Sequence, residues 1–164
     1  MEIIKGEDAV NASKWIDEAF QTARHSICLR AHCGAVIVKN GEIIGRGFNS
    51  PAGNDPKNRR CLAEYAIPEG FRHDRTCCVH AEQRAIQDAL KNNREMAGAD
   101  IYFSRADDAG NKLKSKDIKC TICSRAVLDA GISRFFLEFE DGIRAYGTKE
   151  FDDLSYEYKT PLAR

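Results

Sequence analysis

The sequence has no long apolar run, no excess of charge of either sign and no internal repeat. None of its apolar stretches approaches the ~20 residues that a membrane-spanning helix needs. The 164 residues carry 25 Lys and Arg against 25 Asp and Glu. This zero net charge argues against a nucleic-acid partner, although a small nucleotide stays open as a ligand. With 43% apolar and 30% charged residues and no linker, residues 1–164 are expected to form one domain.

A secretory signal is also missing. The first ten residues, MEIIKGEDAV, are acidic and have no apolar core, so we expect a cytoplasmic, reducing location. Seven cysteines in such a chain, an odd number, indicate metal ligation more than disulfides. Some of them could equally be buried free thiols, Cys33 first among them.

Hydrophobic periodicity predicts an α/β domain with helices on both faces of its sheet. A helical period runs from Asn11 to about Arg30, and two β-rich runs flank the turn Asn40-Gly41, which predicts a hairpin. Residues 50–79 show no period and predict a long loop. Further elements are expected in the order helix from about Ala81 to Asn93, strand ADIYFS, polar loop 105–119, helix from Cys120, strand ISRFFLEFE, hairpin through Asp141-Gly142 and short helix KEFDDLSYEY.

Two short motifs carry the chemistry. One is His80-Ala81-Glu82 at the start of a helix, and the other is Cys120-Thr121-Ile122-Cys123 at the start of the next. One imidazole and two thiolates are three of the four ligands of a tetrahedral zinc, which leaves one position for water, as in catalytic sites. Glu82, two residues after His80, could reach that water. Alone, Glu82 would be interpreted as a helix cap and the C-x-x-C as a redox or structural motif.

Together, the two motifs resemble the H-x-E and C-x-x-C signature of zinc-dependent nucleobase deaminases. The stretch CGAVIVKNGEIIGRGFNSP resembles the start of deoxycytidylate deaminases, and the likeness covers about residues 12–137. It implies a three-layer α/β/α fold with a five-stranded mixed sheet, and one catalytic zinc held by His80, Cys120 and Cys123. It also implies proton transfer by Glu82. Asn49 would bind the ligand's sugar, although Asn49 could be only a turn residue, and the backbone near Ala81 and Ser104 would contact the base.

The chain departs from this pattern in four places. Lys119 stands where a proline normally precedes the first cysteine, and Ser50 stands where a second glycine is usual. Residues 105–119, the inserted segment, add about a dozen residues that could enter the site or form a solvated loop. The end of the chain predicts an antiparallel fifth strand, as in deaminases of free cytidine, rather than a parallel one.

A second, structural zinc and a phosphate contact are further hypotheses. The resemblance places Cys28, Cys61, His73 and Cys78 (or Cys77) where some deoxycytidylate deaminases hold a structural zinc, although they could be free thiols. The basic run Lys57–Arg60 could hold a 5′-phosphate or be a solvated loop.

The sequence therefore predicts a zinc-dependent hydrolytic deaminase that converts dCMP to dUMP. Free cytidine, deoxycytidine or another amino-heterocycle of the guanine or pterin type is the alternative. An RNA-editing enzyme and an inactive zinc-binding module are the other readings. The resemblance implies a homo-oligomer that binds a small nucleotide or nucleoside and no membrane.

Overall fold

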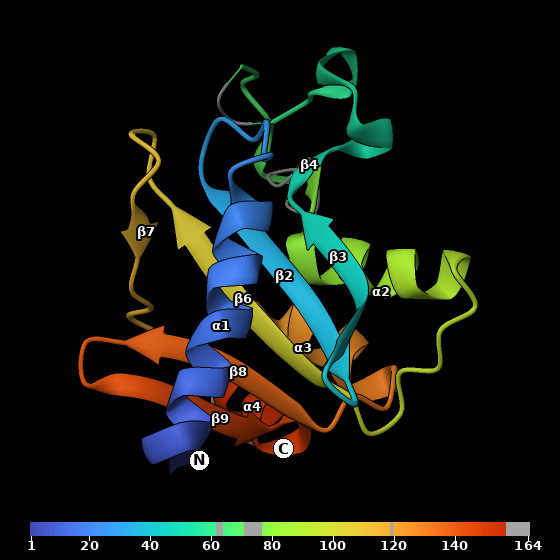
Figure 1. The fold of residues 1–164 in the computed structure, drawn as a ribbon. Helices are drawn as coiled ribbons and strands as arrows, with labels where there is room; N and C mark the ends of the chain where they lie inside the picture. Colours follow the sequence, from blue (N-terminus) through green and yellow to red (C-terminus); the bar gives the residue numbers. More distant parts are fainter. Residues whose placement is uncertain (62–63, 71–76, 119, 157–164) are drawn as a thin grey trace, which may run out of the picture.

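The computed structural model describes residues 1–61, 64–70, 77–118 and 120–156. Figure 1 shows three layers, with helix α1 in front of a central sheet and the other helices behind it. In the described residues, no helix combines the length and hydropathy needed to cross a bilayer. The helices are α1 (Gly6–Ala23), α2 (Ala81–Lys91), α3 (Thr121–Asp129) and α4 (Thr148–Ser155), with short 3-10 turns η1 (Ala52–Asn54) and η2 (Pro56–Asn58).

The main sheet has the strand order β1-β9-β8-β6-β2-β3, and β7 pairs with β6 beside this path. Only β6 and β8 are parallel, and all other pairs described are antiparallel. The strands are β1 (Glu2–Ile3), β2 (His32–Lys39), β3 (Glu42–Phe48), β6 (Asp100–Ala106), β7 (Lys112–Leu113), β8 (Arg134–Phe139) and β9 (Gly142–Gly147), while β4 (Ser50–Pro51) and β5 (Cys78–Val79) form a separate two-stranded sheet.

Each face of the sheet has its own apolar layer, because side chains alternate along every strand. On one face, Val36 and Tyr102 pack with Ile16 and Ala19 of α1. On the other face, a cluster joins α2, α3 and α4 to the sheet, and Phe135 stacks on Phe151 of α4 at a ring distance of 4.0 Å. The prediction of helices on both faces is thus confirmed. The predicted antiparallel fifth strand is confirmed too, since β9 pairs antiparallel with β8.

One prediction of local structure was wrong. Helix α1 ends at Ala23 rather than Arg30, because Ser26 turns away and its hydroxyl donates to the carbonyl of Asn49, 2.7 Å away. The described part of residues 50–79 is a long loop as expected, with the 3-10 turns η1 and η2, and its two ends pair as β4 and β5. The expected five-stranded mixed sheet is confirmed, and the two-residue strands β1 and β7 extend it to seven strands.

Candidate active site

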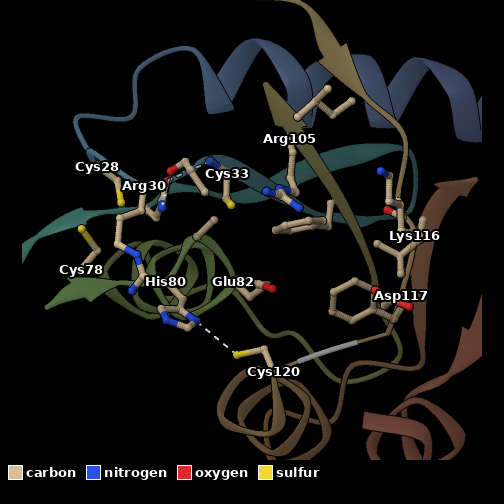
Figure 2. Close-up of a pocket in the computed structure, with 18 of the residues that line it drawn as sticks. Cys28, Arg30, Cys33, Cys78, His80, Glu82, Arg105, Lys116, Asp117 and Cys120 are labelled. Carbon is tan, nitrogen blue, oxygen red and sulfur yellow. Dashed lines mark hydrogen bonds between the residues drawn. The ribbon is translucent and has the colours of Figure 1, made fainter. Parts of the chain in front are cut away.

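Two helix N-termini meet at the predicted zinc ligands. His80 immediately precedes α2, Cys120 immediately precedes α3, and Cys123 lies in the first turn of α3. The His80 Nδ1 lies 3.2 Å from the Cys120 Sγ and 3.1 Å from the Cys123 Sγ. The two sulfurs are 3.0 Å apart. Figure 2 shows His80 and Cys120 facing each other at the base of a cavity.

This donor set fits zinc. In the described part of the chain, His80, Cys120 and Cys123 are the only group of three such residues whose ligand atoms all lie within 4.8 Å of one another. A hydrogen bond from Cys123 lowers the pKa of Cys120 to about 4, although burial opposes the shift, and His80 also favours the thiolate. One nitrogen and two sulfurs leave a fourth tetrahedral position open toward the cavity.

Glu82 lies in the first turn of α2 with only 7% of its surface exposed. Burial raises the pKa of its carboxyl above the ordinary value, and the neighbouring Cys120 thiolate raises it further. Figure 2 shows the carboxyl directed into the cavity, on the same side as Cys120. A buried carboxyl with a raised pKa next to a metal site is suited to taking and returning a proton.

A close contact between β3 and α2 positions this helix. A Cβ added at Gly47 would lie 2.2 Å from the carbonyl oxygen of Ala81 and 2.3 Å from the amide nitrogen of Ala85. Only glycine leaves room for the helix backbone at this distance. The Gln83 side chain also accepts a hydrogen bond from the His80 amide at 3.2 Å. The predicted metal ligand His80 and the predicted proton carrier Glu82 are thereby held against the sheet.

Asn49 lines the cavity, but most of its amide serves the protein itself. Its Oδ1 accepts hydrogen bonds from the Ser26 hydroxyl at 2.7 Å and the Cys33 amide at 2.8 Å. Its Nδ2 donates to the Ala31 carbonyl at 2.8 Å. The side chain therefore holds the connection between α1 and β2, and one N–H is left for a ligand.

The two expected backbone contacts differ. Ala81 lines the cavity, whereas Ser104 is not among its lining residues. Ser104 lies two residues after Tyr102 on β6, so its side chain is on the same face of the sheet as Tyr102, the face that α1 covers. Its buried hydroxyl has no hydrogen-bond partner in the described residues. Phe103 and Arg105, on the opposite face of the same strand, line the cavity instead. Strict alternation along ADIYFSRA was the signal that could have identified them.

The cavity has a volume of about 680 Å³ and extends in two directions from Glu82. At one end it meets residues of the connections before β2 and after β3, and Figure 2 places Cys28, Arg30 and Cys78 there. At the other end it meets residues 113–117 of the inserted segment, with Lys116 and Asp117 in view. The inserted segment thus borders the cavity and is not a solvated loop away from it, the other interpretation of the sequence.

Ionic contacts to the sheet hold the inserted segment in place. Its strand β7 pairs with the end of β6. Lys112 lies 2.8 Å from Asp17 of α1 and 3.0 Å from Glu138 of β8, and Lys114 also pairs with Glu138. The Ser115 amide donates to the Glu138 carbonyl at 2.7 Å. These contacts make the described part of the segment a fixed wall of the cavity.

The cysteines outside the first site are free thiols. Cys28 and Cys78 interact directly, and this contact, after burial, raises the pKa of Cys78. Cys61 lines the same cavity, as does Cys33, whose pKa burial raises to about 12. Cys33 is a free thiol that packs against the core, as expected, and it also borders the cavity. His73 lies outside the described residues, so a second zinc stays a prediction.

The basic run Lys57–Arg60 does not reach the cavity lining. The Arg59 Nη2 instead donates to the Ile27 carbonyl at 2.7 Å, and the Arg60 Nη1 donates to the Lys57 carbonyl at 3.0 Å. These side chains stabilise their own loop.

Comparison with known proteins agrees with this site. Residues 9–138 match the family model described as the cytidine and deoxycytidylate deaminase zinc-binding region. The deoxycytidylate deaminase of Enterobacteria phage T4 is 26% identical over 158 residues, covering 76% of each chain. That of Mycobacterium phage D29 is 28% identical over 122 residues, covering 71% of this chain and 84% of its own.

Solved structures show the same fold. The dCMP deaminase of the cyanophage S-TIM5 in apo form has a TM-score of 0.54 at 22% identity, covering 80% of this chain and 82% of its own. The cytidine deaminase of Burkholderia pseudomallei has a TM-score of 0.54 at 16% identity, and the match covers 85% of this chain and 94% of its own. With the family model matching most of the chain and the His-Cys-Cys cluster assembled, the chain belongs to the zinc-binding cytidine and deoxycytidylate deaminase family.

Proposed function

We propose that this protein is a zinc-dependent deaminase that hydrolyses dCMP to dUMP and ammonia. The observation that carries the proposal is the convergence of His80, Cys120 and Cys123 beside a buried Glu82, at the base of a cavity of about 680 Å³. Pockets of about 300–1,000 Å³ suit small ligands. The curated relatives from phages T4 and D29 are both named deoxycytidylate deaminases, which supports the choice of dCMP.

Zinc held by His80, Cys120 and Cys123 supplies a Lewis acid that makes a water acidic enough to ionise near neutral pH. Glu82 accepts the proton from the attacking water, and the resulting hydroxide adds to C4 of the cytosine ring. Glu82 passes this proton to ring N3. It then takes the proton of the hydroxyl now on C4 and delivers it to the amine at C4, so that the C–N bond breaks, ammonia leaves and C4 becomes the carbonyl of uracil. The raised pKa of Glu82 suits this exchange, because a group that both accepts and donates works best when its pKa lies near the working pH.

The finer expectations belong to the same proposal. The chain works as one domain and a homo-oligomer in the cytoplasm, where its seven thiols stay reduced, and all seven are free in the structure. Asn49 contributes its remaining N–H to the ligand, and the backbone at Ala81 contributes to binding of the base. Ser104 keeps a backbone role only, since its side chain lies on the other face of the sheet.

Ammonia release from the zinc-loaded protein tests the proposal. The substrates are dCMP, deoxycytidine, cytidine, guanine and an aminopterin ring, with heat-inactivated protein as the blank. We expect turnover of dCMP above all others. Turnover of guanine or the pterin alone would support zinc-dependent deamination but would show that dCMP is not the substrate. No ammonia from any of the five would refute the proposed function.

A further inference from the structure

The charged side chains that line the cavity differ in whether they already have an interaction partner. Glu82 serves the chemistry, and Lys114 is neutralised by Glu138. Arg30 and Asp117 each have an interaction of their own. Two cations are then left among the lining residues, Arg105 above Glu82 and Lys116 on the inserted segment.

Arg105 lies two residues after Phe103 on β6, on the face that lines the cavity. Figure 2 shows its guanidinium directed into the cavity above Glu82, beside Cys33. The contact that it makes there is with the Cys33 thiol, a weak partner for a guanidinium. In the described part of the chain, no carboxylate lies within ion-pair distance of Arg105, so its five donors lack an anionic acceptor.

Lys116 lies on the inserted segment, one residue after the Ser115 amide that donates to the Glu138 carbonyl. This anchor fixes its backbone at the rim of the cavity, while the side chain is exposed to an entering ligand. Within the ranges that the structure describes, Lys116 also has no ion pair. An arginine at the end of β6 and a lysine farther along the inserted segment therefore both present positive charge to the same cavity.

A cytosine base is neutral and has no need of two cations, whereas a phosphate carries up to two negative charges and several strong acceptors. Guanidinium groups bind phosphate through paired donors, and lysine adds a point charge. The other run considered for this role, Lys57–Arg60, lies outside the cavity lining.

We propose that Arg105 and Lys116 form a phosphate subsite and select a nucleotide over a nucleoside. This subsite rests on the proposed function, because it assumes that the cytosine base binds beside Glu82. The inserted segment is then a specificity element, since it carries Lys116 and pairs through Leu113 with Arg105 itself.

The test compares dCMP with deoxycytidine in Arg105→Gln and Lys116→Gln. Arg94→Gln and Lys91→Gln are matched controls, since both residues are exposed and lie outside the cavity lining. Each test variant should lower kcat/KM for dCMP by about 10- to 100-fold, mainly through KM, as expected for one lost charge-assisted hydrogen-bond donor. The value for deoxycytidine should stay unchanged, so the preference for the nucleotide collapses. Neither Arg94→Gln nor Lys91→Gln should change the preference for dCMP over deoxycytidine.

Two outcomes would overturn the subsite while leaving deamination intact. One is an equal loss on both substrates, which would assign Arg105 to the base or to stability. The other is collapse of the preference in Arg30→Gln and not in Arg105→Gln, which would place the phosphate at the opposite end of the cavity.

Binding of inorganic phosphate gives a measurement that needs no turnover. Phosphate should raise the Tm of the zinc-loaded protein above that in chloride of equal ionic strength. The rise should disappear in Arg105→Gln and Lys116→Gln and persist in Arg94→Gln. If the protein deaminated neither substrate, the proposed function would fail, and this pattern would still support the subsite. A rise unchanged in both test variants would overturn it.

Discussion

Replacing Gly47 by alanine tests how the site is built. The added Cβ would lie 2.2 Å from the carbonyl oxygen of Ala81 and 2.3 Å from the amide nitrogen of Ala85. Both are backbone atoms of α2, so no side-chain rotation can relieve the contact. Restoring an ordinary van der Waals separation requires α2 to retreat from β3 by about 1 Å.

This retreat has a stability cost and a larger catalytic cost. Overpacking of this kind costs about 1–3 kcal/mol, and for a chain of this size each kcal/mol lowers Tm by about 2–4 °C. His80 and Glu82 flank Ala81, so they move with the first turn of the helix. Misplacement of catalytic groups by about 1 Å costs on the order of 100-fold in rate. We therefore expect Gly47→Ala to be folded at 25 °C and to lose about 100-fold in kcat/KM.

Ammonia release, thermal unfolding and zinc content are measured on the same preparations. Gly45→Ala is the matched variant, because its Cβ would lie 2.3 Å from the carbonyl oxygen of Ala85, one turn farther from Glu82. Gly45→Ala should lower Tm about as much as Gly47→Ala does, but it should lower kcat/KM less. Gly147→Ala should change neither, since its Cβ would meet nothing within 4 Å. Wild-type activity and Tm in Gly47→Ala would refute the described contact of α2 with β3.

Four other expectations follow from the same geometry. Glu82→Gln should lower kcat by at least about 10²–10⁴-fold with zinc content unchanged, and full activity would remove Glu82 from the mechanism. Removal of zinc by a chelator should abolish ammonia release and lower Tm, and activity that survives in metal-free protein would contradict the ligand assignment. Metal analysis giving two zinc ions per chain, and one in Cys78→Ser, would support the structural zinc, whereas one in the wild type would end the idea. Burial raises the pKa of Glu138, but Lys114 and Lys112 outweigh it, so the pKa is lowered. Glu138→Gln should therefore destabilise the protein by about 1–2 kcal/mol at pH 7. The difference should shrink as the pH falls below about 4.3, the ordinary pKa of a glutamate, and vanish below the lowered pKa of the folded protein, and a difference that is constant with pH would contradict the ion pair.

The zinc ligands and most elements could be predicted because their signals are local. The turn Asn40-Gly41 specifies its hairpin through two adjacent residues with positive φ, 52° and 76°. His80 and Cys120 each stand at a helix start that the sequence marks by its own periodicity. Gly131, with φ of 73°, follows the Ala130 cap of α3, the position at which glycine commonly ends a helix. In each case, the information lies within a few residues of the feature.

The wrong end predicted for helix α1 depends on contacts between distant residues. Helix α1 could continue beyond Ala23 by periodicity, but Ser26 binds Asn49, 23 positions later. The same contacts give Asn49 a second task, the support of the backbone of residues 26–33, beside its predicted contact with the ligand. No local pattern contains such a pair.

The inserted segment shows how far a motif alone specifies the site. Cys120 has φ of 87° and ψ of 79°, a left-handed conformation that costs a residue with a side chain about 1–3 kcal/mol. In related sequences a proline before the first cysteine limits the backbone at this point, whereas this chain has Lys119. The described residues just upstream are instead anchored by Ser115 and Lys114 to Glu138. These contacts fix the inserted segment five residues before Cys120, and they come from Glu138 of β8, which belongs to neither of the two zinc-site motifs.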